Sequence, residues 1–407
     1  MRMEFSILAD SFNKMESTRK RLELTQYLVE LFEKTPHEVI SKIVYLLQGK
    51  LRPDFEGIEL GVAEKLAIRA ISKSSGIPIK KIEDEYRKGG DLGHAASVIL
   101  EQKTQTTFLV EDITVERVYE TLFKIAKLEG SRSQDMKMKY ISSLLNDANP
   151  LEASFILKIL LGTLRLGIAE NTVMDALAIA FSGSKENRKI LEHAYNVSSD
   201  LGKVAETIAT SNLEGVEKFE VILFNPIRPM LADRVKSEDE AVEKMGDEFA
   251  AEYKLDGERV QLHVEGDKVV LFSRSLENIS SYYPDIIEKI PKAIQAENAI
   301  LEAEAVAINE NTGEFLPFQE LMHRRRKYKI EKAVTQYPIT VNFFDILYCN
   351  GKSCLEMDYK SRREKLEKIV KEDDYAKHIP MAIVKNSNDI EDFLENSINS
   401  GSEGLML

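Results

Sequence analysis

The hydrophobic pattern of the chain changes near residue 213, and this change constrains the fold more than any other feature. Before that point apolar residues recur at the spacing of one helix face, as in residues 22–32. After it they alternate with polar residues, as in residues 260–264, which is the spacing of a strand. We therefore predict a multi-domain fold, with an all-α domain over residues 1–212 and an α+β domain with antiparallel sheets over residues 213–407.

The composition describes a globular protein and excludes several classes of site. The 407 residues are 43% hydrophobic and 30% charged, which is typical of a globular chain with two or three domains. The sequence contains no apolar run of about 18 residues, so we predict no membrane span. The two cysteines exclude a cysteine zinc site and fit a reducing compartment. Because no targeting signal is evident, we expect a cytoplasmic location.

The net charge of −13 counts against a nucleic-acid partner unless basic residues are concentrated locally. One basic stripe begins at Arg324 and Arg325 and extends to Lys329. A solvated helix end explains most charge runs. In a chain this acidic, however, consecutive arginines are more easily explained by contact with phosphate, so we take Arg324 and Arg325 as candidate phosphate contacts.

The segment Glu252–Arg259 predicts a strand that enters a hairpin. Side chains two positions apart share a face of a strand, so we expect Glu252, Lys254 and Asp256 on one side. For the triplet alone, an ordinary salt-bridged surface lysine is the simpler explanation. The complete pattern, Lys-x-Asp-Gly-x-Arg, is more specific.

This pattern resembles the signature motif of the covalent nucleotidyltransferases, which are the DNA ligases, RNA ligases and mRNA capping enzymes. The resemblance implies that the amine of Lys254 attacks the α-phosphate of a nucleoside triphosphate and holds the nucleotide as a phosphoramidate. Carboxylates and phosphates favour the charged, unreactive lysine, so the motif also implies Mg²⁺ to offset their charge. Gly257 would let the backbone approach a ligand, and Arg259 would offer its guanidinium to ribose or phosphate oxygens.

Two segments of the helical half resemble each other, because Leu60–Lys65 recurs as Leu166–Asn171. Each places a glycine just before a helical pattern. The free N–H groups of a helix start suit a phosphate, which points to Gly61 and Gly167. Chance similarity or helix-turn-helix packing explains the repeat equally well.

The segment Leu164–Val173 also resembles the hallmark stretch of the N-terminal DNA-binding domain of archaeal and eukaryotic replicative DNA ligases. RNA ligases and capping enzymes do not carry this domain. The resemblance implies that Gly61, Arg165 and Gly167 contact the DNA backbone at a nick without reading its sequence. It also makes DNA the expected partner of the basic stripe.

A polar segment between the two repeated stretches contains Gln105, Phe108 and Leu109, and we predict it to be a loop. It resembles the Gln-x-x-Phe-Phe motif with which archaeal ligases bind the sliding clamp, although Leu109 replaces the last aromatic residue. The resemblance implies the clamp as a second partner. A loop with Phe108 tucked into the helical domain is the alternative.

The second half matches further motifs of the ligases. Arg274 follows a predicted strand, at the position of an arginine that reaches the nucleotide or the phosphate at the nick. Glu302 and Glu304 share a face of another predicted strand, where they would repel each other unless a cation intervened. The carboxylate of the matching family motif lies at the position of Glu304. A later motif implies that the carboxylate of Glu403 helps to position metal and phosphates.

The adenine site is also implied by the resemblance. Phe343 and Phe344 point to opposite faces of a predicted strand, so that one is expected in the core, and the match selects Phe344 to stack on the adenine. Glu252 would orient the adenine through its backbone or carboxylate, and Arg259 would contact the ribose. Residues 359–371 are predicted to form a peripheral helix.

The resemblance covers essentially the whole chain and implies an ATP-dependent DNA ligase that seals nicks in duplex DNA during replication, repair and recombination. It implies ATP and Mg²⁺ as cofactors and nicked DNA as the partner of a monomeric protein. The family continues with a lysine-bearing motif and an oligonucleotide-binding barrel. We therefore expect a truncated chain, with weak self-adenylation and weaker ligation.

Two alternatives remain at this point. The first is an RNA ligase or a capping-type nucleotidyltransferase, against which the helical N-terminal half argues. The second is a non-catalytic fragment that binds DNA or the clamp. ADP and GTP stay open as additional nucleotide donors, whereas NAD is disfavoured because NAD-type ligases need cysteine zinc ligands.

Overall fold

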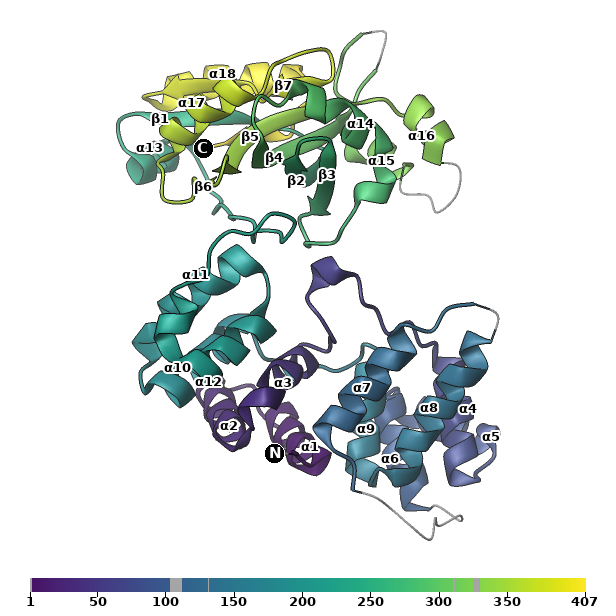
Figure 1. Ribbon diagram of the computed structural model, residues 1–407. Coiled ribbons are helices and arrows are strands. Elements are labelled where there is room, and N and C mark those ends of the chain that lie inside the picture. Colours follow the sequence, from purple (N-terminus) through teal and green to yellow (C-terminus); the bar gives the residue numbers. More distant parts are fainter. Residues whose placement is uncertain (1, 103–111, 131, 310–311, 325–329) are drawn as a thin grey trace. The chain divides into compact units, whose positions relative to one another are not determined.

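The computed structural model describes residues 2–102, 112–130, 132–309, 312–324 and 330–407. The chain forms two compact units, unit 1 (Met1–Phe219) and unit 2 (Glu220–Leu407). Unit 1 is helical and unit 2 contains the sheets, which confirms the predicted order of an all-α part followed by an α+β part (Figure 1). In the described part of the chain, no helix combines the length and the apolar character needed to span a membrane.

Unit 1 is built from short helices joined by tight turns. Its α-helices are α1 (Phe5–Glu16), α2 (Arg21–Lys34), α3 (Ile40–Leu47), α4 (Glu64–Ser75), α5 (Ile79–Gly89), α6 (Leu92–Glu101), α7 (Val115–Ala126), α8 (Ser133–Asp147), α9 (Pro150–Leu160), α10 (Glu170–Ser182), α11 (Arg188–Ser198) and α12 (Leu201–Val216). Short 3₁₀ turns, η1 (His37–Val39), η2 (Asp54–Glu56) and η3 (Lys185–Asn187), lie between them.

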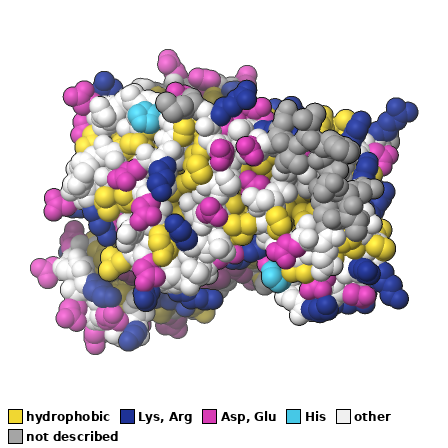
Figure 2. All heavy atoms as spheres, turned by 90° about the horizontal axis from the view of Figure 1, so that it is seen from below, with side chains coloured by type: hydrophobic (Ala, Val, Ile, Leu, Met, Phe, Trp, Pro, Cys, Tyr) yellow, Lys and Arg dark blue, Asp and Glu magenta, His cyan; other side chains and the backbone are white. Residues whose placement is uncertain are grey.

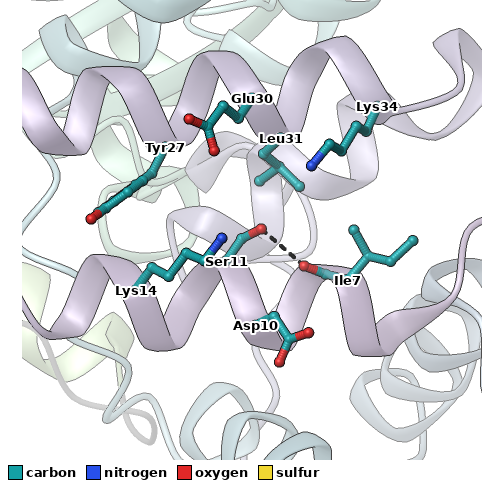
Figure 3. Close-up of a pocket in the computed structure, with 8 residues that line it drawn as sticks. All are labelled: Ile7, Asp10, Ser11, Lys14, Tyr27, Glu30, Leu31 and Lys34. Carbon is teal, nitrogen blue, oxygen red and sulfur yellow. Dashed lines mark hydrogen bonds between the residues drawn. The ribbon is translucent and has the colours of Figure 1, made fainter.

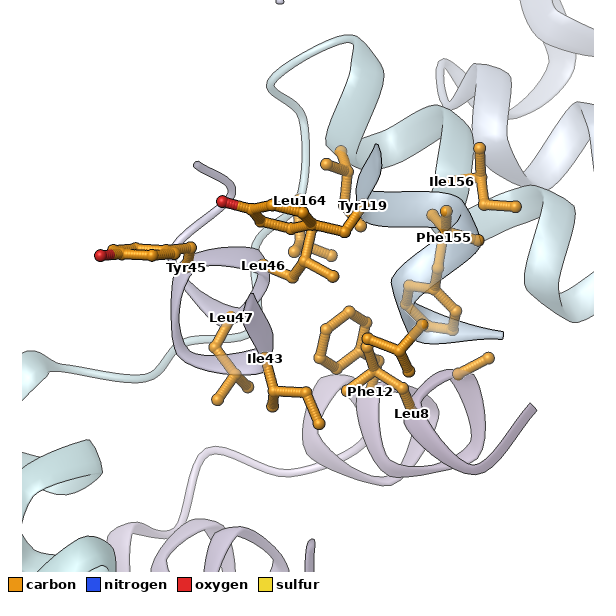
Figure 4. Close-up of a cluster of buried hydrophobic side chains, with 14 of the residues drawn as sticks. Leu8, Phe12, Ile43, Tyr45, Leu46, Leu47, Tyr119, Phe155, Ile156 and Leu164 are labelled. Atoms are coloured by element: carbon orange, nitrogen blue, oxygen red, sulfur yellow. The ribbon is translucent and has the colours of Figure 1, made fainter. Parts of the chain in front are cut away.

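Helix α9 forms the middle of the core of unit 1. It begins with a capping box, in which the Asn149 side chain and Glu152 bind each other's backbone N–H groups. All residues from Glu152 to Leu160 are buried. Phe155 meets Phe12 of α1 edge to face, with ring centroids 5.4 Å apart. Figure 4 shows this pair among side chains from other helices, so α9 joins elements that are far apart in the sequence.

The repeated segments of unit 1 have the same local structure. Gly61 and Gly167 both adopt left-handed backbone conformations, with φ of 50° and 68°, which favour glycine. Helices α4 and α10 begin three residues later, after Ala63 and Ala169, neither of which provides a side-chain cap. The N-cap residue of neither helix thus supplies a side-chain acceptor, which suits an anion at the helix start.

Unit 2 contains two sheets that pair mainly antiparallel. The smaller sheet has the order β8-β1-β9 and the larger one β3-β2-β4-β5-β6, with β7 added parallel to β5. The strands are β1 (Phe249–Lys254), β2 (Glu258–Glu265), β3 (Lys268–Ser273), β4 (Asn298–Ala307), β5 (Ile339–Cys349), β6 (Lys352–Ser353), β7 (Ala376–His378), β8 (Met381–Val384) and β9 (Gly404–Met406). The helices are α13 (Glu238–Met245), α14 (Pro284–Ala293), α15 (Phe318–Met322), α16 (Ile330–Gln336), α17 (Tyr359–Ile369) and α18 (Ser387–Asn399), with the 3₁₀ turn η4 (Ser280–Tyr282).

A β-bulge between β4 and β5 sets the direction of the two neighbouring phenylalanines. Ala303 pairs with Phe343 and Glu302 pairs with Asp345, so Phe344 has no partner on β4. Phe343 is fully buried in the main core of unit 2. Phe344 is partly exposed and packs in a different cluster. The two rings thus lie in different surroundings, as the sequence predicts.

Strand β2 has two different faces. Alternate residues from Val260 to Val264 are buried in the main core. On the other face, Gln261 binds the backbone of Ile227, donating to its carbonyl at 2.8 Å and accepting from its N–H at 2.7 Å. His263 Nδ1 accepts from the N–H of Phe224 at 2.9 Å. These side chains therefore fasten the start of unit 2 onto its larger sheet.

His263 should make the stability of unit 2 depend on pH. Its side chain is fully buried, and burial lowers its pKa from 6.5 to about 3. Below pH 6.5 His263 binds a proton in the unfolded chain but stays neutral in the folded chain. The neutral histidine therefore costs no stability above pH 6.5, and the free energy of unfolding declines as the pH falls below that value. We expect a loss of about 2 kcal/mol at pH 5.

Urea unfolding of the wild type and of a His263→Gln variant at pH 7 and pH 5 checks this expectation. Buried carboxyl groups change the stability of both proteins with pH, so the difference between them isolates the histidine. The variant should lose less stability on acidification than the wild type. Equal losses would show that His263 is not held neutral in the folded protein.

Candidate active site

Lys254 is the last residue of β1, and it meets Glu403 next to the start of β9. The backbone N–H of Glu403 donates to the Lys254 carbonyl at 2.8 Å. The Lys254 ammonium forms an ion pair with the Glu403 carboxylate, and 47% of the lysine side chain remains exposed. The structure therefore brings together two predicted site residues from distant motifs and leaves the amine accessible.

The prediction that Asp256 shares a strand face with Lys254 is wrong. Strand β1 ends at Lys254, and Asp256 lies in the turn that follows. Its carboxylate accepts a hydrogen bond from the backbone N–H of Phe318 at 3.0 Å. Asp256 therefore holds the first turn of α15 in place, instead of standing beside the lysine.

Gly257 permits a close approach to β4, whereas we predicted an approach to a ligand. A Cβ atom at this position would lie 2.3 Å from the carbonyl oxygen of Ala305 and 2.9 Å from Cγ of Glu304. Both distances are shorter than real Cβ contacts. The glycine of the motif is thus needed to bring the Lys254 turn against the strand that carries Glu304.

We expect Gly257→Ala to destabilise the protein by about 1–3 kcal/mol and to impair adenylation, because the added methyl group displaces the turn or Glu304. Gly89→Ala is a matched control, since its Cβ would meet no atom closer than His94 Cδ2 at 3.8 Å. Urea unfolding of both variants measures the difference. Equal stabilities of the two variants would contradict the packing argument.

Glu304 lies beside two cationic side chains. It pairs with Arg259 in the register of β2 and β4. Burial raises the pKa of Glu304 to about 8, although the charges of Arg259 and Lys254 act to lower it. Burial therefore disfavours the charged form of the carboxyl group, and a positive charge added nearby would favour it.

Arg259 is held by Glu302, the second carboxylate of β4. Its Nε donates to Glu302 at 2.8 Å, and Glu302 is buried. Its Nη1 donates to the carbonyl of Met230 at 3.3 Å. The guanidinium also lies 5.3 Å from the centroid of the Phe344 ring. The charge of Glu302 is thus neutralised by an arginine. This pairing reduces the repulsion that the sequence predicts between Glu302 and Glu304.

Glu252 is held by helix α17, whose residues we predicted to be peripheral. Tyr359 donates a hydrogen bond to Glu252 Oε1, and Arg363 Nη1 donates to the same oxygen at 3.2 Å. Burial raises the pKa of Glu252 to about 7, against the effect of these two donors. Helix α17 is therefore part of the site, and the peripheral assignment is wrong for the face that carries Tyr359 and Arg363.

Arg274 lies in the turn after β3 and is exposed. The preceding residue, Ser273, pairs with Val260 on β2, so the turn follows the strand next to Arg259. Figure 1 shows β3 beside β2 in the larger sheet. Arg274 therefore lies at the end of the sheet that carries Arg259, where it can reach a ligand.

Arg324 does not form the exposed basic stripe that we predicted. Its side chain is fully buried, and Nη2 donates to Asp285 at 2.7 Å. The structure therefore argues against a direct DNA contact by Arg324, because its charge is already paired in the interior. Arg325 lies outside the described residues, as do Gln105, Phe108 and Leu109 of the predicted clamp motif. On the face shown in Figure 2, Lys and Arg side chains are intermixed with Asp and Glu.

Two further features concern cations and cavities. Among the described residues, no group of three or more His, Cys, Asp or Glu side chains is placed to hold a metal ion. A depression of about 280 Å³ lies between α1 and α2 of unit 1, lined by side chains such as Lys14 and Glu30 (Figure 3). None of the predicted site residues lines it, so we assign the chemistry to the groups around Lys254.

Comparison with known proteins identifies the family. Residues 4–178 match the model of the DNA ligase N terminus, and residues 229–407 match the model of the ATP dependent DNA ligase domain. The DNA ligase of Nitrosopumilus maritimus (strain SCM1) is 91% identical over 405 residues, which cover 100% of this chain and 69% of that protein. The chain belongs to the ATP-dependent DNA ligase family.

More distant relatives agree with this assignment. The DNA ligase of Cenarchaeum symbiosum (strain A) is 69% identical over 100% of this chain and 69% of its own length. A probable DNA ligase of Aquifex aeolicus (strain VF5) is 46% identical over 99% of this chain and 69% of its own. A solved structure named Pmar-Lig_Pre. shares the fold, with a TM-score of 0.53, 16% identity, and coverage of 98% of this chain and 72% of that one.

The ligase is thus an enzyme that seals nicks in DNA and uses ATP. The matched descriptions name DNA ligases, which favours this assignment over the RNA ligase, capping enzyme and non-catalytic alternatives. The chain spans about 69% of the length of the relatives described above.

Proposed function

We propose that Lys254 carries the adenylate during nick sealing. Its amine attacks the α-phosphate of ATP and pyrophosphate leaves; the AMP then passes to the 5′-phosphate at the nick. The 3′-hydroxyl finally attacks that phosphate and AMP departs. The main support is the position of Lys254, whose half-exposed side chain pairs with Glu403 and lies close enough to Glu304 to affect its ionisation.

Glu304 and Glu403 are our candidates for holding Mg²⁺. Carboxylate oxygens suit this cation, which commonly binds one or two protein carboxylates together with substrate phosphates. The raised pKa of Glu304 supports the choice, because burial disfavours its charged form and a cation bound beside it would offset that cost. Bound there, Mg²⁺ would neutralise charge that develops on the phosphates during the attack.

The nucleotide would bind to the side chains that surround Lys254. We assign the adenine ring to Phe344, which is partly exposed, and its edge to Glu252. Arg259 would bind the ribose, with its orientation set by Glu302. Arg274 would reach the nucleotide or the phosphate at the nick from the turn after β3.

Unit 1 would bind the DNA backbone through its two repeated helix starts. Gly61 and Gly167 are exposed and precede helices whose N-cap residue is an alanine without a side-chain cap, which supports phosphate binding at both places. Arg165 is exposed next to the second turn, and its Nη1 donates to the carbonyls of Gly162 and Leu164. Such contacts would position the duplex without reading its sequence.

We assign DNA binding to residues 1–212 and adenylation to residues 213–407. The proposed setting is replication, repair and recombination of chromosomal DNA in the cytoplasm, with the ligase acting as a monomer. A sliding clamp bound through Gln105, Phe108 and Leu109 remains part of this proposal because of the motif they resemble.

A nick-sealing assay tests the proposal. The chain is incubated with ATP, Mg²⁺ and a duplex that carries one 5′-phosphorylated nick, and both the DNA product and the intact mass of the protein are measured. We expect sealed DNA and a protein mass increased by one AMP. Salt-dependent binding to the nicked duplex without a lysine–AMP adduct would instead support the non-catalytic alternative.

A further inference from the structure

The two donors on α17 act on a single oxygen of Glu252. Tyr359 and Arg363 both donate to Oε1, and no described residue donates a hydrogen bond to Oε2. By holding Oε1, helix α17 therefore also fixes the direction of the lone pairs on Oε2. Oε2 thus keeps its lone pairs without a hydrogen-bond donor from the described residues, and 13% of the Glu252 side chain is exposed.

Arg363 is itself held firmly. Its Nη2 donates to the carbonyl of Ile379 at 2.9 Å, and its Nε donates to Glu367 at 2.8 Å. Only 6% of the side chain is exposed. Because each edge of the guanidinium has a partner, the contact with Glu252 cannot shift without breaking another hydrogen bond.

Helix α17 is also attached to the strand that carries Phe344. Arg362 forms a two-point ion pair with Asp345, with Nε and Nη2 at 2.7 Å and 3.0 Å from its carboxylate oxygens. Asp345 directly follows Phe344 in β5. The same helix thus positions Glu252 on β1 and the strand segment next to the proposed adenine platform.

An acceptor at this position distinguishes the two purines. Adenine presents an amino group, which donates, at the position where guanine presents a carbonyl oxygen, which accepts. An ionised carboxylate oxygen can only accept, so it binds the first and repels the second. A protonated carboxyl group could donate to guanine instead, and burial favours that form, since it raises the pKa of Glu252 to about 7 even with both donors in place. The acceptor form of Oε2 therefore dominates above pH 7.

We propose that Tyr359 and Arg363 set the preference for adenine over guanine, by holding Glu252 with Oε2 as an acceptor for the amino group of the base. The inference rests on the proposed placement of the adenine edge at Glu252. It gives α17 a role in nucleotide selection: the two residues act through Glu252 and do not touch the base.

Tyr359→Phe tests the proposal, since it removes one hydroxyl group and keeps the ring. Dissociation constants for ATP and GTP are measured by calorimetry at pH 8, above the pKa of Glu252, and the rates of lysine–AMP and lysine–GMP formation by intact mass. The wild type should prefer ATP. The variant should lose at least about tenfold of this preference, mainly through weaker ATP binding. Arg363→Lys, which cannot reproduce the fork, should move the ratio in the same direction.

Two controls separate the possible failures. Tyr375→Phe removes a hydroxyl that binds Asp285 elsewhere in unit 2, and it should leave the ATP-to-GTP ratio unchanged. Glu252→Gln tests the placement of the base: an unchanged ratio would overturn the adenine position and the inference with it. If Glu252→Gln alters the ratio but Tyr359→Phe weakens ATP and GTP equally, α17 has a structural role alone, and the inference fails while the proposed function stands.

Discussion

Lys254→Ala is expected to abolish the AMP adduct and, with it, nick sealing. The proposed reaction passes through a bond between the lysine nitrogen and the α-phosphate, so removing the amine removes the nucleophile. We expect the rate of adenylation to fall by on the order of 10⁴-fold or more. Intact-mass measurement after exposure to ATP and Mg²⁺ should show one added AMP in the wild type and none in the variant.

Lys254→Arg is the sharper comparison. Arginine keeps a positive charge that can pair with Glu403, but it stays protonated and cannot act as the nucleophile. It should therefore be as inactive as the alanine variant while preserving the ion pair. Lys385→Ala, which removes an exposed lysine of unit 2, should still form the adduct. A full adduct on Lys254→Arg would show that the lysine acts through its charge and that another residue carries the AMP.

The ion pair with Glu403 also explains how the amine of Lys254 is held in place before ATP binds. Lys254 is paired with Glu403, and Arg259 is paired with Glu302 and covers part of the Phe344 ring. Both cations thus have partners within the protein. Binding of the triphosphate must compete for these cations, and a divalent cation that engages Glu403 would free the amine.

Local sequence patterns predicted the parts of the site that depend on neighbours in the chain. The alternation around Val260 placed the Lys254 motif at a strand–turn–strand, because side-chain direction in a strand follows from its period of two. Phe343 and Phe344 were separated for the same reason, with a bulge sharpening the effect. The repeated glycine turns of unit 1 were visible because their conformation restricts the residue type.

Contacts between distant segments could not be predicted in this way. Tyr359 lies 107 positions from Glu252, and the many charges of α17 made it resemble an ordinary solvated helix. The prediction for Arg324 is wrong for the same reason. Its place in a basic run suggested exposure, but Asp285, 39 residues earlier, pairs with it in the interior. A paired arginine next to a buried aromatic or carboxylate gives no local signal in the sequence.

Glu304→Gln is expected to lower the rate of adenylation by about 10²–10³-fold and to raise the Mg²⁺ concentration needed for half-maximal rate. The substitution preserves the shape of the side chain next to Arg259 and Gly257 but removes the charge that the carboxylate acquires when a cation approaches. The rate of lysine–AMP formation, measured over a series of Mg²⁺ concentrations, gives both quantities. Glu304→Asp should recover part of the metal dependence, because it restores a carboxylate at a shorter reach.

Glu265→Gln provides the matched control for this prediction. Glu265 is the exposed last residue of β2, where it pairs with Asn298 at the other end of the same two strands. Glu265→Gln makes the same change of side chain as Glu304→Gln at an exposed position, and adenylation should be unaffected. A Glu304→Gln protein with wild-type rate and wild-type Mg²⁺ dependence would remove Glu304 from the metal site. Glu403 would then be the carboxylate to test next, because it forms the ion pair with Lys254.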